Sequence, residues 1–139
     1  MAVRIAKFRA DLRKFRKIGL DTSVLIHHLE DVAPYADLTE AAFAAIAAGV
    51  PTAVLSTLSV TELLVQPFAD RHEDRVVPAG HGAAKEAARL RALYGLRTPD
   101  ALLVATALGE GAEAFLTNET RLRVLKPEPI TMLVLGDYV

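Results

Sequence analysis

The feature that most constrains this fold is an alternation of short apolar runs with longer segments of helical periodicity. The apolar runs near residues 17–20, 52–56, 113–117 and 131–135 have the length and composition of buried strands. Helical patterns separate most of them, and glycine or proline marks many of the boundaries. This alternation predicts an α/β protein with a parallel sheet, because each parallel strand needs a helical crossover to reach the next.

The helical patterns set the expected order of elements between the strands. We expect helices over residues 24–30, 38–49, 59–65, 83–94 and 98–108, and a short edge strand at 75–77. Asp37 or Thr39 would cap the second helix at its start, and Gly49 would end it. Right-handed crossovers place the strand-to-helix junctions on one edge of the sheet, so polar residues at those junctions can converge.

Length and composition exclude several classes of protein. A chain of 139 residues is long enough for one domain with a single core. The absence of cysteine excludes disulfides, thiolate metal sites and a cysteine nucleophile. No apolar run is long enough to cross a bilayer, and the N-terminus lacks the apolar core of a secretory signal. We therefore expect a soluble, cytoplasmic protein with no membrane span.

The net charge of −1 conceals a strong asymmetry between the start of the chain and the rest. Residues 1–17 carry seven of the 16 lysines and arginines and a single acid, so this arm is +6 and the remainder is −7. One helical face of the arm is apolar, with Ile5, Phe8, Leu12 and Phe15. We expect a basic amphipathic arm that docks on its own chain or on a neighbouring subunit, with an RNA or anionic-lipid contact as the alternative.

Four carboxylates lie at or just after predicted strand ends and helix starts: Asp21, Glu62, Asp100 and Glu119. Three of them have ordinary structural explanations. Asp21 could cap the helix that follows it. Glu62 fits a capping box that begins at Ser59, and Asp100 fits the first turn of a helix with Thr98 at its N-cap. Only their predicted convergence on one sheet edge favours a functional site.

Acids grouped at one edge would repel one another unless a cation held them together. The available ligands are oxygens, with no cysteine and no histidine pair at metal spacing, which favours Mg²⁺ or Mn²⁺ over zinc. We expect the four histidines, His27, His28, His72 and His81, to be exposed residues of loops or helix ends. A carboxylate site of this kind suits hydrolysis of phosphodiesters by metal-activated water. No serine elbow and no P-loop offers another chemistry.

Four stretches, taken in order, resemble the motifs of the PIN-domain family and, within it, the VapC-type ribonuclease toxins. They are residues 19–26 (GLDTSVLI), 58–63 (LSVTEL), 96–107 (LRTPDALLVATA) and 115–119 (FLTNE), within a span of about 18–125. Each motif is short, but the ordered set is specific. The resemblance implies a three-layer α/β/α nuclease domain with a central parallel sheet over residues 18–139, preceded by the arm at 1–17.

The resemblance also implies an activity and its residues. Family members cleave RNA with a divalent metal, form homodimers and are inhibited by an antitoxin whose tail enters the acidic groove. By this resemblance Asp21, Glu62 and Asp100 would be the metal-binding catalytic acids, and Ser23 would support the site. The fourth catalytic position falls on Glu119, where many members have aspartate, so either Glu119 or its neighbour Asn118 would serve there.

Two other functions remain open at this point. A non-catalytic PIN-fold RNA-binding or regulatory scaffold would account for Glu119 and for the basic arm. A metal-dependent phosphatase with Asp21 as nucleophile is the other, although Ser23 stands where such enzymes have a second aspartate. Three arginines near the motifs, Arg97, Arg121 and Arg123, could hold RNA phosphates or could be solvated helix-end charges.

Overall fold

A computed structural model describes residues 4–59, 76–78 and 80–139. Within these residues five parallel strands form one sheet in the order β3-β2-β1-β4-β5. The strands are β1 (Lys17–Leu20), β2 (Thr52–Ser56), β3 (Val76–Val77), β4 (Ala114–Thr117) and β5 (Thr131–Val134). The predicted parallel sheet is thus confirmed, with β1 at its centre and the short strand β3 at one edge.

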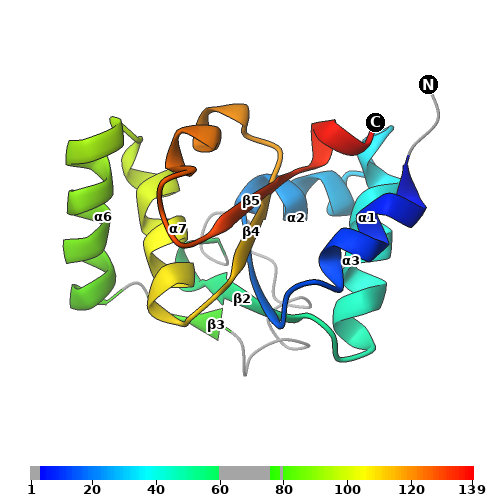
Figure 1. Cartoon of the computed structure of the whole chain (residues 1–139), viewed down its shortest axis with the longest axis horizontal. Coiled ribbons are helices and arrows are strands. Elements are labelled where there is room, and N and C mark those ends of the chain that lie inside the picture. Colours follow the sequence, from blue (N-terminus) through cyan, green and yellow to red (C-terminus); the bar gives the residue numbers. More distant parts are fainter. Residues whose placement is uncertain (1–3, 60–75, 79) are drawn as a thin grey trace.

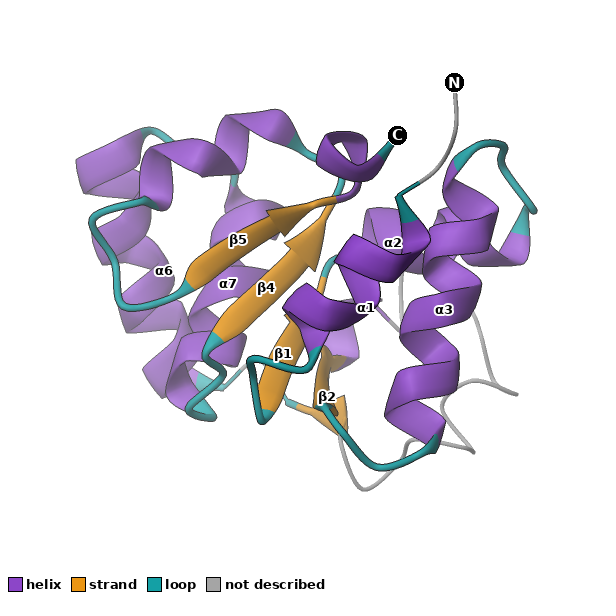
Figure 2. Cartoon of the chain, turned by 45° about the vertical axis from the view of Figure 1, so that its right-hand side comes forward, coloured by secondary structure: helices purple, strands orange, loops and turns teal. Residues whose placement is uncertain are grey.

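Helices cover both faces of the sheet (Figures 1 and 2). They are α1 (Ile5–Leu12), α2 (Thr22–Leu29), α3 (Tyr35–Ala47), α6 (His81–Tyr94) and α7 (Thr98–Gly109), with 3₁₀ turns η2 (Thr120–Leu125) and η3 (Leu135–Tyr138). The first three pack on one face, and α6 and α7 pack on the other. This confirms the three-layer α/β/α architecture. None of these helices is long and apolar enough to cross a lipid bilayer.

Alternate residues of the central strands supply the two hydrophobic cores. Ile18 and Leu20 of β1 face the core shared with α1, α2 and α3, whereas Phe115 of β4 faces the core under α6 and α7. Gly19 lies between Ile18 and Leu20 in β1, where an added Cβ atom would be 2.6 Å from the Cβ of Ala107 on α7. Its lack of a side chain therefore allows α7 to pack directly on β1.

Helix α1 docks on its own chain. Phe8 and Leu12 are fully buried in the first core. The amide of Arg4 donates to the carbonyl of Tyr138 at 2.7 Å, and the Tyr138 hydroxyl donates to Oδ2 of Asp11 at 2.5 Å. The apolar stripe of the arm is therefore used for packing within the chain, and its polar faces remain outside.

Several helix boundaries differ from the predictions. The N-cap predictions for α3 were wrong, because Pro34 holds the N-cap position and Asp37 lies inside the first turn. Helix α7 begins at Thr98 with Arg97 at the N-cap, so the expected cap at Thr98 was also wrong. Helix α2 begins at Thr22, two residues earlier than predicted. Most of the helix predicted over 59–65 lies outside the described residues.

Candidate active site

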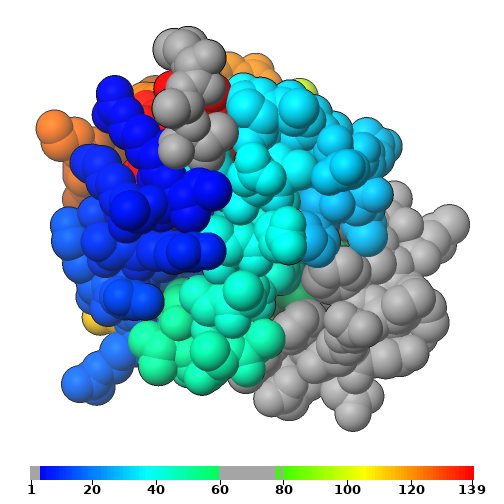
Figure 3. Space-filling view, turned by 90° about the vertical axis from the view of Figure 1, so that its right-hand side faces the viewer, coloured from blue at the N-terminus to red at the C-terminus, as the bar shows by residue number. Residues whose placement is uncertain are grey.

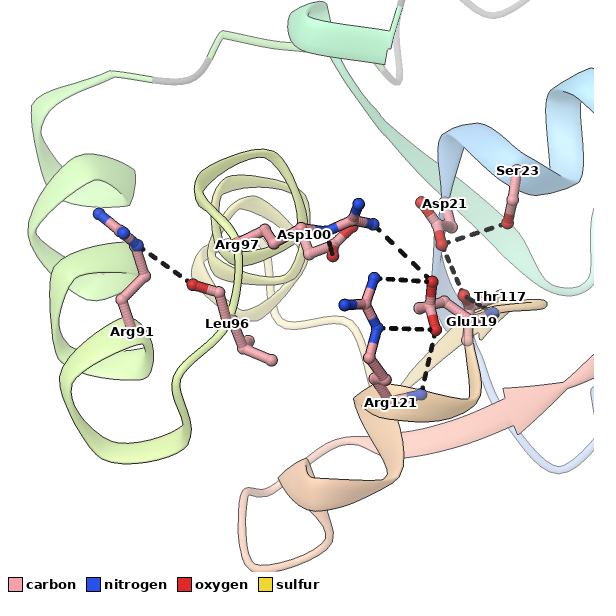
Figure 4. Close-up of polar contacts among 9 residues, drawn as sticks. All are labelled: Asp21, Ser23, Arg91, Leu96, Arg97, Asp100, Thr117, Glu119 and Arg121. Atoms are coloured by element: carbon pink, nitrogen blue, oxygen red, sulfur yellow. Dashed lines mark hydrogen bonds and ion pairs between the residues drawn. The ribbon is translucent and has the colours of Figure 1, made fainter.

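Asp21 sits between β1 and α2, at the carboxyl edge of the sheet. It occupies the N-cap position of α2 in an extended conformation, yet its side chain makes no capping hydrogen bond. The capping explanation for this residue is therefore wrong. The side chain is 5% exposed and turns toward the end of the neighbouring strand β4 (Figure 4).

Two hydroxyl groups hold the Asp21 carboxylate. Thr117, the last residue of β4, donates to Oδ2 of Asp21 at 2.5 Å, and Ser23 donates to the same oxygen at 3.2 Å. Each hydroxyl also accepts a hydrogen bond from a backbone amide: Asn118 N–H donates to Ser23, and Glu119 N–H donates to Thr117. These bonds fix the ends of two adjacent parallel strands around one carboxylate. Sequence reasoning missed Thr117, whose only signal was a hydroxyl at the end of an apolar run.

The environment of Asp21 is unfavourable to its charge. Burial raises the pKa of the Asp21 carboxyl, and the nearby charge of Asp100 raises this pKa further. The hydrogen bonds from Thr117 and Ser23 act in the opposite direction. No lysine, arginine or histidine of the described chain forms an ion pair with Asp21. The Asp21 carboxylate is therefore buried beside a second acid, and no basic side chain of the described residues is paired with it.

Asp100 lies in the first turn of α7, across a small cavity from Asp21. The cavity has a volume of about 290 Å³, and its lining includes both aspartates together with Ser23, Arg97 and Glu119. The Asp100 side chain is 14% exposed and accepts a hydrogen bond from Nε of Arg97 at 3.2 Å. The structure thus brings together three of the four predicted acids on one edge of the sheet.

Glu119 reaches the cavity from the loop after β4 and is held by two arginines (Figure 4). Arg121 contacts both carboxylate oxygens, at 3.2 and 3.3 Å, and Arg97 lies 3.8 Å from Oε2. These hydrogen bonds from Arg121 lower the pKa of Glu119. Arg97 therefore stands between Asp100 and Glu119, with a guanidinium group at the mouth of the acidic cavity.

Asn118 supports the site without lining the cavity. Its Oδ1 accepts from Gly136 N–H at 3.1 Å, and its Nδ2 lies 3.2 Å from Nε2 of His27. His27 stacks on the ring of Tyr35 with centroids 4.8 Å apart, and its Nδ1 is buried without a partner in the described chain. His27 and His28 are half-buried in α2, so the prediction of exposed histidines was wrong for both.

The other predicted site residues lie apart from this cavity or outside the described part of the chain. Arg123 pairs with Asp137, at 2.7 Å, and does not line the cavity. Glu62 and His72 fall in the segment that is not described. Thr22 and Ser59, both buried, share a hydrogen bond of 2.9 Å, which places Ser59 beside the start of α2. Among the described residues no three acids or histidines form a group that could hold a metal.

The fold and the acidic edge together define a class of protein: an α/β/α domain with carboxylates at the carboxyl ends of its parallel strands. The family model for the PIN domain matches residues 18–126, and the chain belongs to this family. The match begins in β1 and extends just past η2, so it includes every described element that contributes to the cavity. No curated protein matches this chain.

Solved structures with the same fold come from several bacteria. FitAcB from Neisseria gonorrhoeae is 18% identical with a TM-score of 0.68, over 86% of this chain and 98% of that one. DNA-bound VapBC from Salmonella typhimurium is 18% identical with a TM-score of 0.63, over 86% and 98% of the two chains. A toxin-antitoxin complex from Klebsiella pneumoniae is 20% identical with a TM-score of 0.59, over 85% and 97%. At these identities the likeness concerns the fold.

Proposed function

We propose that this protein is an endoribonuclease that hydrolyses RNA phosphodiester bonds with Mg²⁺ or Mn²⁺. The observation that carries the proposal is the buried Asp21 carboxylate, which shares a cavity with Asp100 and has no ion-pair partner in the described chain. Burial of a charge without a counter-ion is costly, so such an arrangement is stable when a cation binds there. The family membership supports the same conclusion, because the matched range, residues 18–126, includes all of the proposed site acids.

The donor chemistry fits a hard divalent cation. Asp21 and Asp100 offer carboxylate oxygens, and Ser23 adds a hydroxyl on the same cavity wall. Neither thiolate nor imidazole lines the cavity, so the ligands that zinc prefers are missing from the described lining. Asp21 and Asp100 would hold the ion, and we expect Glu62 to complete the set.

The chain's own residues would orient the reaction. A bound ion would activate a water molecule and neutralise charge on the phosphoryl oxygens. Thr117 and Ser23 keep the Asp21 carboxylate in one orientation by donating to the same oxygen. Arg97 and Arg121, which pair with Glu119 in the free protein, could exchange this carboxylate for an RNA phosphate, a group that guanidinium binds through two parallel hydrogen bonds. Glu119 would then be free to add its carboxylate to those of Asp21 and Asp100 in the cavity.

We further propose that the protein is the toxin of a type II toxin-antitoxin pair, acts in the cytoplasm and forms a homodimer. One solved structure that shares its fold is the toxin-antitoxin complex from Klebsiella pneumoniae, and 97% of the matched chain of that complex aligns with this one. An antitoxin would then have as its target an acidic cavity whose lining includes Arg97, with Arg121 paired to Glu119 beside it. Co-expression with the product of the adjacent gene, followed by copurification, tests this partner.

The nuclease proposal is tested with labelled RNAs of several sequences and the purified protein in Mg²⁺, in Mn²⁺ and in EDTA. We expect cleavage in the metal buffers, none in EDTA, and none by Asp21→Asn or Asp100→Asn. Equal cleavage by both variants and the parent protein would refute the assignment. RNA binding without any product, together with no Mn²⁺ binding by calorimetry, would instead favour the non-catalytic scaffold.

A further inference from the structure

The arginines in the described part of the chain fall into two groups by the partners of their side chains. All five described arginines after residue 80 contact a carboxylate or a carbonyl of the chain: Arg89, Arg91, Arg97, Arg121 and Arg123. Four others precede β1: Arg4, Arg9, Arg13 and Arg16. These four are exposed, and within the described residues their guanidinium groups have neither a hydrogen bond nor an ion pair.

The single acid of this segment does not neutralise these arginines. Asp11 accepts from Tyr138, and it pairs with Lys14 at 3.0 Å and with Lys7 at 3.9 Å. Arg9 and Arg13 lie four residues apart on another face of α1, where like charges at this spacing destabilise a helix. Four unpaired guanidinium groups, here called the α1 arginine surface (Arg4, Arg9, Arg13 and Arg16), therefore remain available to an anionic partner.

The apolar side of α1 is not available to a partner. Phe8 and Leu12 are fully buried in the core, and Ile5 and Phe15 pack against it. In Figure 3 α1, in blue, lies on the outside of the molecule beside α3, in cyan. A helix that binds a lipid surface inserts an apolar face between the headgroups, which α1 cannot do while it is docked. The exposed chemistry of α1 thus favours a partner that offers many phosphates.

We propose that the α1 arginine surface binds the phosphate backbone of the RNA whose scissile bond lies in the acidic cavity. The rest of the chain has a charge of −7, so a polyanion is attracted to this segment and repelled elsewhere. Arginine also matches phosphate geometry better than lysine does. The inference rests on the proposed function, since it takes RNA as the substrate.

Short structural links connect the arginine surface to the cavity. Arg4 bonds to the carbonyl of Tyr138 in η3, and Gly136 of the same turn bonds to the side chain of Asn118. Asn118 precedes Glu119, which lines the cavity. An RNA strand that leaves the cavity over η3 therefore reaches the start of α1, and the helix guides its flanking nucleotides.

The test measures RNA binding by a variant that should not cleave RNA. Anisotropy of a labelled single-stranded RNA is measured with Asp21→Asn in EDTA over a range of salt concentrations, so cleavage is not required. Adding Arg9→Gln and Arg13→Gln should weaken binding about tenfold at about 0.1 M salt and lower the slope of log K against log salt by about 1.4. Glutamine keeps good helix propensity, so α1 should remain folded.

A matched control removes two exposed charges elsewhere, Lys85→Gln and Lys126→Gln, and should change both quantities little. Unchanged binding in the Arg9/Arg13 variant, or an equal loss in the control, would overturn the proposal. A changed oligomeric state or lost binding to phosphatidylserine vesicles, with RNA binding intact, would also overturn it. Arginine-dependent RNA binding by a wild-type protein that neither cleaves RNA nor binds Mn²⁺ would refute the nuclease and leave the α1 arginine surface as an RNA-binding site.

Discussion

Thr117 donates a hydrogen bond of 2.5 Å to Oδ2 of Asp21 across 96 residues of sequence. Thr117 ends β4 and Asp21 directly follows the adjacent parallel strand β1, and the pairing of Leu20 with Leu116 sets the two residues side by side. This bond stabilises the ionised form of a carboxyl group whose pKa is raised by burial. Thr117 therefore acts on the cavity through Asp21, although it does not line the cavity itself.

Removing the Thr117 hydroxyl should weaken metal binding. In Thr117→Val the Asp21 carboxylate loses a donor, its pKa rises further, and protons compete more strongly with the ion. A hydrogen bond to a charged group contributes about 1.5–3 kcal/mol, so the Mn²⁺ affinity should fall about tenfold or more near neutral pH. Calorimetric titration of the variant at several pH values checks this prediction.

Thr106→Val is the matched control for this substitution. Thr106 is equally buried, and its hydroxyl donates to the carbonyl of Leu102 within α7, away from the cavity. We expect this variant to keep the Mn²⁺ affinity of the parent protein. Similar losses in both variants would mean that buried threonines affect the fold in general, and would remove the specific role assigned to Thr117.

Replacing Asp21 should stabilise the metal-free protein at neutral pH. The pKa of Asp21 is raised in the folded state, so its contribution to stability is greatest below the unfolded pKa and is lost as pH rises through the folded pKa. Asp21→Asn avoids this loss and should show a higher Tm than the parent protein in EDTA at pH 7. The difference should shrink toward acid pH.

Thermal unfolding at several pH values, with and without Mg²⁺, measures this effect. Added Mg²⁺ should raise the Tm of the parent protein, because a ligand that binds only the folded state stabilises it, and should leave the Tm of Asp21→Asn unchanged. A Tm difference between the two proteins that does not vary with pH would show that Asp21 is not the group responsible.

Gly19→Ala should destabilise the fold by crowding α7 against the sheet. The added Cβ would lie 2.6 Å from Ala107 Cβ and 2.7 Å from Cδ1 of Phe115, closer than such atoms approach. Overpacking of this kind costs about 1–3 kcal/mol of unfolding free energy. Chemical denaturation of the variant measures that cost.

Gly109→Ala provides the contrast, because a Cβ there meets no atom within 4 Å. Alanine in the helix should leave stability unchanged or raise it by up to about 1 kcal/mol. Combining Gly19→Ala with Ala107→Gly should restore part of the lost stability by removing one of the two contacts. If Gly19→Ala alone is neutral, the close packing of α7 on β1 is not what this position requires.

Local sequence was enough to predict the elements that carry the site. The apolar run before Asp21 and the turn residues before Asp100 mark strand ends and helix starts, which are local properties. Connection rules then placed those junctions on one edge, and Asp21, Asp100 and Glu119 do line one cavity there. The acids could be found because their positions depend on chain order and not on side-chain packing.

The supporting contacts could not be predicted in the same way. The role of Thr117 depends on the register between β1 and β4, which no local pattern specifies. His27 follows an apolar residue near a helix end and looked exposed, yet packing against Tyr35 half-buries it. Proline at the N-cap of α3 likewise displaced the polar caps that propensity favours. For Thr117 and His27 a tertiary contact decided the outcome.

We expect Arg97 to weaken the binding of Mn²⁺ at the site and to strengthen the binding of RNA. Its guanidinium contacts Asp100 at 3.2 Å and lies 3.8 Å from Glu119, so its positive charge lies beside two acids of the cavity. Arg97→Gln removes this competing charge and should strengthen Mn²⁺ binding, by no more than about fivefold because exposed ion pairs contribute about 1 kcal/mol or less. RNA binding without metal should weaken in the same variant, since a phosphate contact is lost. Arg123→Gln is the control, because its partner Asp137 lies away from the cavity, and it should change neither Mn²⁺ binding nor RNA binding. A loss of Mn²⁺ affinity in Arg97→Gln would show that Arg97 organises the acids and does not compete with the metal for them.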